Sequence, residues 1–297
     1  MKICTIIVSY NFAKWIQPCL NSLRESTIAT DVMVIDNNSS DETCKIISEM
    51  YPEVILIKNI DNLGFGKANN LGFRYAIEKG YDYVFLLNQD AWVAADAIEV
   101  LVEAAVANPD YGIVSPIHLN GLGDKLDFGF ATYSHLQSKE EAQRVAAPIT
   151  ECQFINAAMW LVPISALKKV GGFAPIFPHY GEDVDYVHRM RHAGYKIGFA
   201  KGAYGCHDRE YRVVDRPKFF YMEYIYFLSE AVNVHHTFTK YFGYSVLAAI
   251  KKSLLCLFSG KVSDSIKYIS IACKLLAVMP KVVATRSKSK NEVGAYL

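Results

Sequence analysis

The first 110 residues alternate short apolar runs with longer segments of helical periodicity, and this alternation constrains the fold more than any other feature. Four runs predict buried strands, and a predicted helix follows each of them. The strands are 3–8, 31–35, 54–57 and 83–87, and the helices are 13–26, 42–50, 66–79 and 94–108. Strands that alternate with helices of this length form a parallel sheet with right-handed crossovers. In such sheets, ligands bind beyond the carboxyl ends of the strands.

A polar cluster lies after each of the four predicted strands. The clusters are Ser9-Tyr10-Asn11, Asp36 to Ser40, Asn62 to Lys67, and Asn88-Gln89-Asp90. Each cluster taken alone is equally consistent with a turn or a helix cap. Four of them at one edge of a sheet instead predict a binding site for a nucleotide and its phosphates.

Each cluster offers a specific chemistry. Asp36 can accept hydrogen bonds from a nucleobase or a ribose. Gly64 and Gly66 let the backbone approach a phosphate, and Lys67 can offset the phosphate charge. Asp90, at the tip of a very apolar strand, suits an octahedral divalent ion that also takes water and diphosphate oxygens as ligands. The sequence has neither a Walker loop nor the G-x-G-x-x-G fingerprint after its first strand.

A second polar centre lies in Gly181-Glu182-Asp183-Val184-Asp185, at the predicted start of an amphipathic helix. An enzyme that deprotonates a substrate hydroxyl beside a metal-bound diphosphate needs a carboxylate base of this kind. We predict that Asp183 is this base and that Glu182 and Asp185 raise its pKa by like-charge repulsion. The alternative is that these carboxylates only cap a helix, and for Asp185 the two interpretations are equally favoured.

The overall composition excludes several classes of protein. The chain of 297 residues has 31 Lys and Arg against 30 Asp and Glu, so its charge gives no case for nucleic-acid binding. Its seven cysteines are scattered without a C-x-x-C pair, which favours reduced thiols in a cytoplasmic protein. The N-terminal apolar run is too short for a signal peptide, and no uninterrupted apolar run reaches the ~18 residues of a membrane-spanning helix.

Six segments, in this order and spacing, resemble inverting family 2 glycosyltransferases of the GT-A fold, in the bacterial polysaccharide branch that is rhamnosyltransferase-like. The segments are Thr5 to Asn11, Val34 to Asp41, Asn62 to Asn70, Leu86 to Asp90, Gly171 to Phe173, and Gly181 to Asp185. The resemblance covers roughly residues 1 to 210. It implies an α/β catalytic domain over 1–214, a Rossmann-like mixed sheet flanked by helices. This domain would divide into a nucleotide-binding half (1–110) and an acceptor half (111–214), and a helical extension would follow at 215–297.

The resemblance also carries roles onto matching positions. Asp183 would be the general base, Glu182 would support the acceptor side, and Asp90 and His207 would hold Mg²⁺ or Mn²⁺. The donor nucleotide sugar would be bound by Ser9, Tyr10, Asn11, Asp36, Asn38, Gly64, Gly66, Lys67 and Asn88. Two positions depart from the family pattern. The acidic D-x-D becomes Asn88-Gln89-Asp90, which predicts a weaker metal dependence, and Ala174 replaces an Asp that often follows Gly-Gly-Phe.

The substrates follow from the same resemblance. It implies a nucleoside-diphosphate sugar donor, either dTDP-rhamnose or a UDP-sugar, because uracil and thymine present the same edge to Asp36. The acceptor would be a hydroxyl of a growing, lipid-linked surface polysaccharide such as an O-antigen or a capsule. Two alternatives stay open, namely a nucleotidyltransferase that makes nucleotide sugars and a non-catalytic homologue that binds nucleotides or glycans.

Residues 215–297 differ in character from the rest of the chain. An aromatic band at 219–227 precedes two helical patterns with interspersed lysines, 240–258 and 262–283, and the basic end at 286–290 is predicted to be disordered. Basic amphipathic helices with aromatic residues suit the inner face of a membrane. A helical bundle that packs on the catalytic domain or forms a homodimer interface is equally favoured. We therefore expect a cytoplasmic protein, and the first of these two interpretations would also place it at the inner face of the cell membrane.

Overall fold

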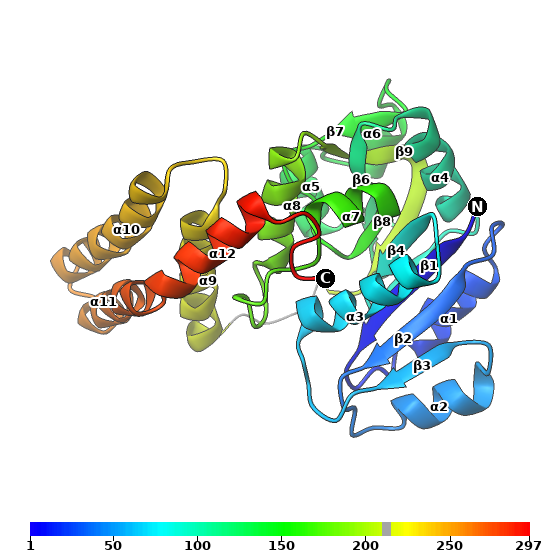
Figure 1. The fold of residues 1–297 in the computed structure, drawn as a ribbon, viewed down its shortest axis with the longest axis horizontal. Coiled ribbons are helices and arrows are strands. Elements are labelled where there is room, and N and C mark those ends of the chain that lie inside the picture. The colour runs from blue at the N-terminus through cyan, green and yellow to red at the C-terminus, as the bar shows by residue number, and fades with distance from the viewer. Residues whose placement is uncertain (210–214) are drawn as a thin grey trace.

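The computed structural model describes residues 1–209 and 215–297, which form a sheet domain and a group of C-terminal helices (Figure 1). The strands are β1 (Ile3–Ser9), β2 (Asp31–Asp36), β3 (Ile55–Lys58), β4 (Tyr83–Leu87), β5 (Ala91–Val93), β6 (Tyr111–Asn120), β7 (Ile149–Glu151), β8 (Met159–Pro163) and β9 (Lys196–His207). The helices of the sheet domain are α1 (Ile16–Arg24), α2 (Thr43–Met50), α3 (Phe65–Glu78), α4 (Ala97–Ala107), α5 (Phe128–Ser134), α6 (Lys139–Gln143), α7 (Ile164–Val170) and α8 (Glu182–His192). The C-terminal helices are α9 (Arg216–Val232), α10 (Phe238–Phe258), α11 (Val262–Ala277) and α12 (Met279–Asn291).

The first four strands form a parallel block on one side of the sheet, in the order β3-β2-β1-β4. This confirms the predicted strands to within one residue at each end, and the predicted helices between them to within three. Ser9 at the end of β1 lies opposite Asp36 at the end of β2. Because the four strands run in one direction, the polar segments that follow them meet at one edge of the sheet.

The remaining strands make the sheet mixed. β8 pairs antiparallel with β4, and β6, β9 and β5 follow on that side, with β7 paired to β9. Strand β8 begins at Met159 and lies in the middle of the sheet, between β4 and β6. Trp160 in this strand is fully buried, and its ring lies 5.8 Å from that of Tyr186, so it belongs to the core.

Two apolar cores lie on opposite faces of the sheet. Helices α3, α5, α7 and α8 cover one face with side chains such as Phe73 and Tyr186. Helices α1, α2 and α4 cover the other face with side chains such as Leu20 and Leu101. Strands β4, β6 and β8 lie between these layers and are almost entirely buried. This packing on both faces holds the sheet, and with it the strand ends that precede the polar clusters, in a fixed position.

The C-terminal helices form a third core of their own, which also takes in Ala174 and Phe177 from the loop before α8. In Figure 1, α10 and α11 project from the sheet domain along the long axis of the molecule. The boundary expected at residue 214 lies outside the described residues. The expected disorder at 286–290 is wrong, because these residues belong to α12. Arg286 is buried there and donates a hydrogen bond to the Ala231 carbonyl at 3.2 Å, and others to the carbonyls of Asn233 and His236.

The end of the chain returns to the sheet domain. The Gly172 N–H donates to the carbonyl of Ala295 at 2.8 Å, and Asn70 Nδ2 donates to the Tyr296 carbonyl at 3.3 Å. Gly171 has φ 92°, and a Cβ at that position would lie 1.9 Å from the Ala295 oxygen. Near the start of the helical region, the Tyr221 hydroxyl of α9 donates to the His179 carbonyl at 2.8 Å, so the region contacts the sheet domain at both of its ends.

One helix among the described residues, α10, is long and apolar enough to cross a membrane, although 28% of its most apolar window is buried. The mean hydropathy of that window is 1.3 despite Lys251 and Lys252. This corrects the expectation that no segment qualifies, since that expectation counted only uninterrupted runs. Helices α11 and α12 pass the same test together, with a bend of 56° between them. Buried core helices of soluble proteins also have this composition, so the finding does not decide between spanning and packing.

Candidate active site

A cavity of about 580 Å³ lies at the carboxyl ends of β1 and β4. Among the residues predicted to bind the donor, its lining includes Ser9, Tyr10, Gly64, Lys67 and Asn88, together with the predicted metal ligand Asp90. Pro178 and His179, from the loop before α8, also line it. The predicted donor residues Asn11, Asp36, Asn38 and Gly66 lie in the segments behind this lining. The structure thus gathers the four polar clusters around one cavity.

Asp36, the residue predicted to bind the base, is only 2% exposed. Its Oδ1 accepts hydrogen bonds from Ser9 Oγ at 2.9 Å and from Ser39 Oγ at 2.5 Å, and its Oδ2 accepts one from the Ser39 N–H at 2.9 Å. These bonds join the end of β2 to the end of β1 and close the turn after β2. The carboxylate therefore organises the floor of the cavity, and direct contact with a base stays a prediction.

Two side chains tie the loop after β1 to its neighbours. Gln89, the middle residue of Asn88-Gln89-Asp90, accepts a hydrogen bond from the Tyr10 N–H at 2.8 Å and donates one to the Tyr10 carbonyl at 3.3 Å. Asn11 Oδ1 accepts from the Ser40 N–H at 2.9 Å. Asn11 and Asn38 both have left-handed backbones, with φ of 52° and 65°. The two asparagines thus shape the turns that border the cavity.

Close packing within the protein explains the two glycines at the start of α3. Gly64 has φ 79°, and a Cβ there would lie 2.6 Å from the Pro178 oxygen. A Cβ on Gly66 would lie 2.9 Å from the Cβ of Phe173. Their small size lets the Pro178 loop and Phe173 approach the first turn of α3, where Lys67 faces the cavity. A role for these glycines in phosphate approach stays a prediction.

The pairing of β5 with β9 brings together the two predicted metal ligands. Ala91, the first residue of β5, lies opposite His207, the last residue of β9. As a result, Asp90 Oδ1 lies 3.4 Å from His207 Nε2, and both side chains are buried. The antiparallel register therefore explains how a histidine far along the sequence reaches the end of β4.

The chemistry at this point fits a divalent ion. Both ring nitrogens of His207 are buried, and neither makes a hydrogen bond to the described residues, an arrangement that a metal bond would satisfy. Within the described part of the chain, no group of three or more His, Cys, Asp or Glu side chains is arranged to hold an ion. Two protein ligands suit Mg²⁺ or Mn²⁺ when diphosphate oxygens and water complete the coordination.

Asp183 lies in the first turn of α8, which starts after the left-handed residue Gly181. The side chain is half-buried, and its Oδ1 accepts a hydrogen bond from the Val184 N–H at 2.9 Å. It lines a cavity of about 180 Å³ that Asn88 and His207 also line. The predicted base and the predicted metal ligand therefore face the same small space.

Burial raises the pKa of Asp183 above its ordinary value, although backbone N–H groups and the charge of Arg209 oppose the rise. The pKa of Glu182 is raised to about 8, first by burial and then by the charge of Asp183. Glu182 is 6% exposed, and its Oε2 makes no hydrogen bond to the described residues. The pKa of Asp183 moves in the predicted direction, but the main cause is burial rather than repulsion by Glu182 and Asp185.

Asp185 has a structural role. Its carboxylate is 1% exposed and accepts a hydrogen bond from Arg189 Nε at 2.8 Å. Arg189 also donates to the carbonyls of Val170 at 3.1 Å and Gly172 at 2.7 Å. The pair anchors α8 to the turn after α7, a structural role that is an ion pair rather than the predicted helix cap.

The sequence interpretation missed a polar cluster next to Asp183. Arg209 donates two hydrogen bonds to the Asp127 carboxylate, at 2.6 and 2.8 Å. With its amide turned so that the oxygen faces Arg209, Asn156 accepts from Arg209 at 3.0 Å and donates to the Tyr133 hydroxyl at 3.1 Å. Arg209 follows His207 by two residues, and that proximity was the one available signal, because Asp127 and Asn156 lie in segments without a motif.

A third cavity, of about 530 Å³, opens on the other side of Asp183 between α5 and α9. Its walls are largely apolar and include Phe128, Met222 and Tyr226. The central cavity shares Asn156, Tyr180, Asp183 and Arg209 with this cavity, and it shares Phe65, Asn88 and His179 with the cavity at the strand ends. The three cavities therefore form one trough, with Asp183 at its middle.

Comparison with known proteins agrees with this arrangement. The model of the family "Glycosyl transferase family 2" matches residues 4–171. The chain is 27% identical over 222 residues to the O-antigen chain rhamnosyltransferase RfbN of Salmonella typhimurium, covering 71% of this chain and 68% of the relative. It is 24% identical over 230 residues to the N-acetylglucosaminyl-diphospho-decaprenol L-rhamnosyltransferase of Mycobacterium tuberculosis, covering 69% and 75%.

Solved structures show the same fold. The S. aureus TarS complex with UDP-GlcNAc aligns with a TM-score of 0.60 at 14% identity, over 96% of this chain and 84% of that one. The mannosyltransferase PcManGT from Pyrobaculum calidifontis, in complex with GDP-Man and Mn²⁺, aligns with a TM-score of 0.56 at 16% identity, over 97% and 83%. Both alignments extend through the C-terminal helices, which confirms the predicted GT-A architecture with a helical extension.

Proposed function

The chain belongs to glycosyl transferase family 2, in its rhamnosyltransferase-like branch, and on that premise we propose a specific reaction. The enzyme moves a sugar, with inversion, from dTDP-rhamnose or a UDP-sugar to a hydroxyl of a growing, lipid-linked surface polysaccharide. The trough carries this proposal, because Asp183 stands between a polar cavity at the strand ends and an apolar cavity beside α9. The first cavity suits the nucleotide and the second suits the acceptor.

Asp183 takes the proton of the acceptor hydroxyl as that oxygen attacks the anomeric carbon. The bond from this carbon to the diphosphate oxygen breaks on the opposite face, so the configuration inverts and nucleoside diphosphate leaves. The burial that raises the pKa of Asp183 improves it as a base near neutral pH. Glu182, with a pKa raised to about 8, keeps its proton at neutral pH and can donate a hydrogen bond on the acceptor side.

Asp90 and His207 would hold Mg²⁺ or Mn²⁺, which neutralises the charge that develops on the leaving diphosphate. Lys67 and the N-terminal turn of α3 face the same cavity and add positive potential there. Ser9, Tyr10 and Asn88 would contact the nucleotide sugar directly. Asn11, Asp36, Asn38, Gly64 and Gly66 would shape the turns around it.

The acceptor assignment draws on the relatives and on the cavity. The two relatives named above act, by their names, on an O-antigen chain and on a decaprenol-linked diphosphate sugar. The acceptor cavity has aromatic walls that suit the apolar faces of sugar rings. A lipid-linked acceptor would place the enzyme in the cytoplasm, at the inner face of the cell membrane. The relatives favour this transferase over a nucleotidyltransferase and over a non-catalytic binding homologue.

The decisive experiment measures thermal unfolding with a panel of nucleoside diphosphates, with and without Mn²⁺, followed by release of nucleoside diphosphate from matching donors. A ligand at about 100 times its dissociation constant adds about 2.7 kcal/mol of stability. A metal-dependent shift with dTDP or UDP, together with donor turnover, would support the proposal and identify the base. A folded protein that responds to no nucleotide would refute it.

A further inference from the structure

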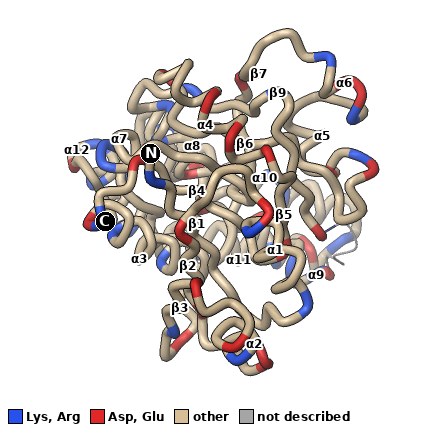
Figure 2. Tube along the Cα trace, turned by 90° about the vertical axis from the view of Figure 1, so that its right-hand side faces the viewer, with Lys and Arg blue, Asp and Glu red and all other residues tan. Residues whose placement is uncertain are grey.

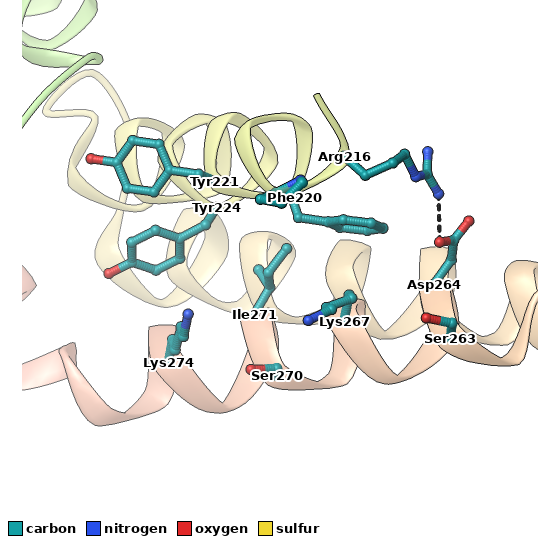
Figure 3. A pocket seen from close by; sticks show the side chains of 11 residues that line it. Arg216, Phe220, Tyr221, Tyr224, Ser263, Asp264, Lys267, Ser270, Ile271 and Lys274 are labelled. Carbon is teal, nitrogen blue, oxygen red and sulfur yellow. Dashed lines mark ion pairs between the residues drawn. The ribbon is translucent and has the colours of Figure 1, made fainter. Parts of the chain in front are cut away.

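A groove of about 420 Å³ runs between α9 and α11 (Figure 3). One wall carries the aromatic side chains Phe220, Tyr221 and Tyr224 of α9, and the other carries Lys267, Ser270 and Lys274 of α11. The three α11 residues are three and four positions apart, so they share one face of the helix. Met222 and Tyr226 of α9 line the acceptor cavity instead. Helix α9 therefore separates this groove from the trough, and none of the reaction chemistry proposed above uses the groove.

The groove is basic. Arg216 at one end pairs with Asp264 at 2.5 Å, whereas Lys267 and Lys274 are exposed and make no ion pair with any described residue. Lys274 Nζ lies 5.9 Å from the ring centre of Tyr224 on the facing wall. Residues 215–297 as a whole have twelve Lys and Arg against five Asp and Glu, while residues 1–214 have 19 against 25. The positive charge of the protein is thus concentrated in the region that holds the groove.

An apolar stripe runs along another side of α11, with Ser263 and Ser270 between it and the lysines. Val262, Ile266 and Ile269 are 54%, 63% and 45% exposed, and Leu276 continues the row at 53%. The neighbouring helix α10 adds Leu254 and Leu255, and Phe258 at the turn between the two helices is 84% exposed. One helix hairpin therefore exposes both a row of lysines and a row of bare apolar side chains.

We propose that this surface docks on a membrane and that the α9–α11 groove receives the phosphate of an anionic phospholipid headgroup. Lys267 and Lys274 contact the phosphate, and the stripe of Val262, Ile266 and Ile269 enters the acyl boundary. Anionic lipid attracts Lys and Arg, and exposed apolar side chains gain stability on leaving water. A soluble phosphate ester would account only for the lysines, and a second copy of the chain would account only for the stripe. An amphiphilic lipid accounts for both.

Flotation of the full-length protein with lipid vesicles, in the absence of donor, tests the proposal. We expect the protein to float with vesicles of phosphatidylcholine and phosphatidylglycerol and to stay behind with phosphatidylcholine alone. The double variant Lys267→Gln/Lys274→Gln should partition about 25-fold more weakly, at about fivefold for each lysine. Ile266→Ser/Ile269→Ser should also lose binding. All four side chains are exposed, so thermal unfolding should remain unchanged.

A matched control separates the groove from general charge. Lys281→Gln/Lys290→Gln removes the same charge from the same region at exposed positions outside the groove, and we expect a clearly smaller loss. Soluble glycerol phosphate as a competitor should leave flotation intact, because it lacks the acyl contacts. Transfer to a water-soluble acceptor should stay normal in every variant, so a failure of docking is distinguishable from a failure of the proposed reaction.

Several outcomes would overturn the proposal. If the wild type and Lys267→Gln/Lys274→Gln float equally well, the groove does not bind lipid. The same conclusion follows if Lys267→Gln/Lys274→Gln and Lys281→Gln/Lys290→Gln lose the same amount of vesicle binding. Displacement by glycerol phosphate would identify a soluble phosphate site. A stable dimer in light scattering that Ile266→Ser/Ile269→Ser dissociates, combined with no flotation, would show that the stripe is an interface between two copies of the chain.

Discussion

The sheet domain and the helical region differ in what they do with their apolar side chains. Of the 24 large apolar side chains that are exposed among the described residues, 16 lie in residues 215–297. The sheet domain covers both faces of its sheet with helices, and both signs of charge are mixed over its surface (Figure 2). Its binding surface is an internal trough. The helical region instead leaves many apolar side chains on its outside, where only contact with another body can cover them.

The first and largest prediction tests whether the trough is the active site, by removing the proposed base. Asp183→Asn should lower turnover by about 10³-fold, since a positioned general base contributes 10²–10⁴-fold. Donor binding should persist, because Asp183 does not line the donor cavity. Release of nucleoside diphosphate measures the first effect, and thermal stabilisation by donor measures the second. Near-normal turnover would show that a residue other than Asp183 is the base.

The second prediction concerns how the buried carboxyl of Glu182 makes the stability of the sheet domain depend on pH. Glu182 keeps its proton up to about pH 8 when folded, whereas an unfolded glutamate loses it near pH 4.3. Between these values the folded state binds more protons, so the stability contribution of Glu182 falls as pH rises, by up to about 1.4 kcal/mol per pH unit.

The variant Glu182→Gln cannot titrate, so its free energy of unfolding relative to wild type should rise between pH 5 and pH 8. Urea unfolding at intervals across this range measures the difference. Glu230→Gln on α9 offers a comparison, because burial also raises the pKa of that residue and its curve should rise in the same direction. Parallel curves for wild type and Glu182→Gln would show that the carboxyl is ionised at neutral pH.

The third prediction tests the metal. His207→Ala should weaken Mn²⁺ binding in the presence of nucleoside diphosphate by about 10²-fold, because one of two protein ligands is lost. Titration calorimetry measures the affinity. His192→Ala, at the far end of α8, is the matched control and should leave it unchanged. If His207→Ala and wild type bind Mn²⁺ equally well, His207 is only a buried neighbour of Asp90.

The smallest effect lies at the joint between the two regions. Gly171→Ala and Gly194→Ala impose nearly the same backbone strain, with φ of 92° and 90°. A Cβ added to Gly171 would collide with the Ala295 oxygen, whereas nothing lies within 4 Å of a Cβ added to Gly194. Strain should cost each variant about 1 kcal/mol, and Gly171→Ala should lose about 1–2 kcal/mol more. Thermal unfolding measures both. Equal losses would mean that the chain end does not depend on this contact.

The sequence predicted the sheet domain well because its signals are local. A buried parallel strand is a short apolar run, and the polar segment after it marks the ligand edge, so the sequence alone places Ser9, Asn88 and Asp90 at that edge. The approach of Asp90 to His207 also depends on the register of β5 against β9, which no local pattern encodes. In this case the resemblance to a family supplied what the pattern could not.

Long-range contacts explain what the sequence could not reveal. Arg209 acquires its role from Asp127 and Asn156, which only the folded chain brings together. Burial, rather than neighbouring charge, raises the pKa of Asp183, and burial depends on packing across the whole domain. The basic segment near Arg286 looked disordered because its partners, the carbonyls at the end of α9, are far away in the sequence. Polarity alone does not indicate whether such partners exist.

The return of the chain end to Gly172 has a geometric consequence. A helical region attached at one end could rotate about its link. A helical region attached at both ends keeps a constant orientation relative to the sheet domain. If α10 and α11 rest on a bilayer, Asp183 then stands at a set height above the lipid surface. The distance from that surface to the base would then select acceptors by length, that is, by how many sugar units separate their terminal hydroxyl from the membrane.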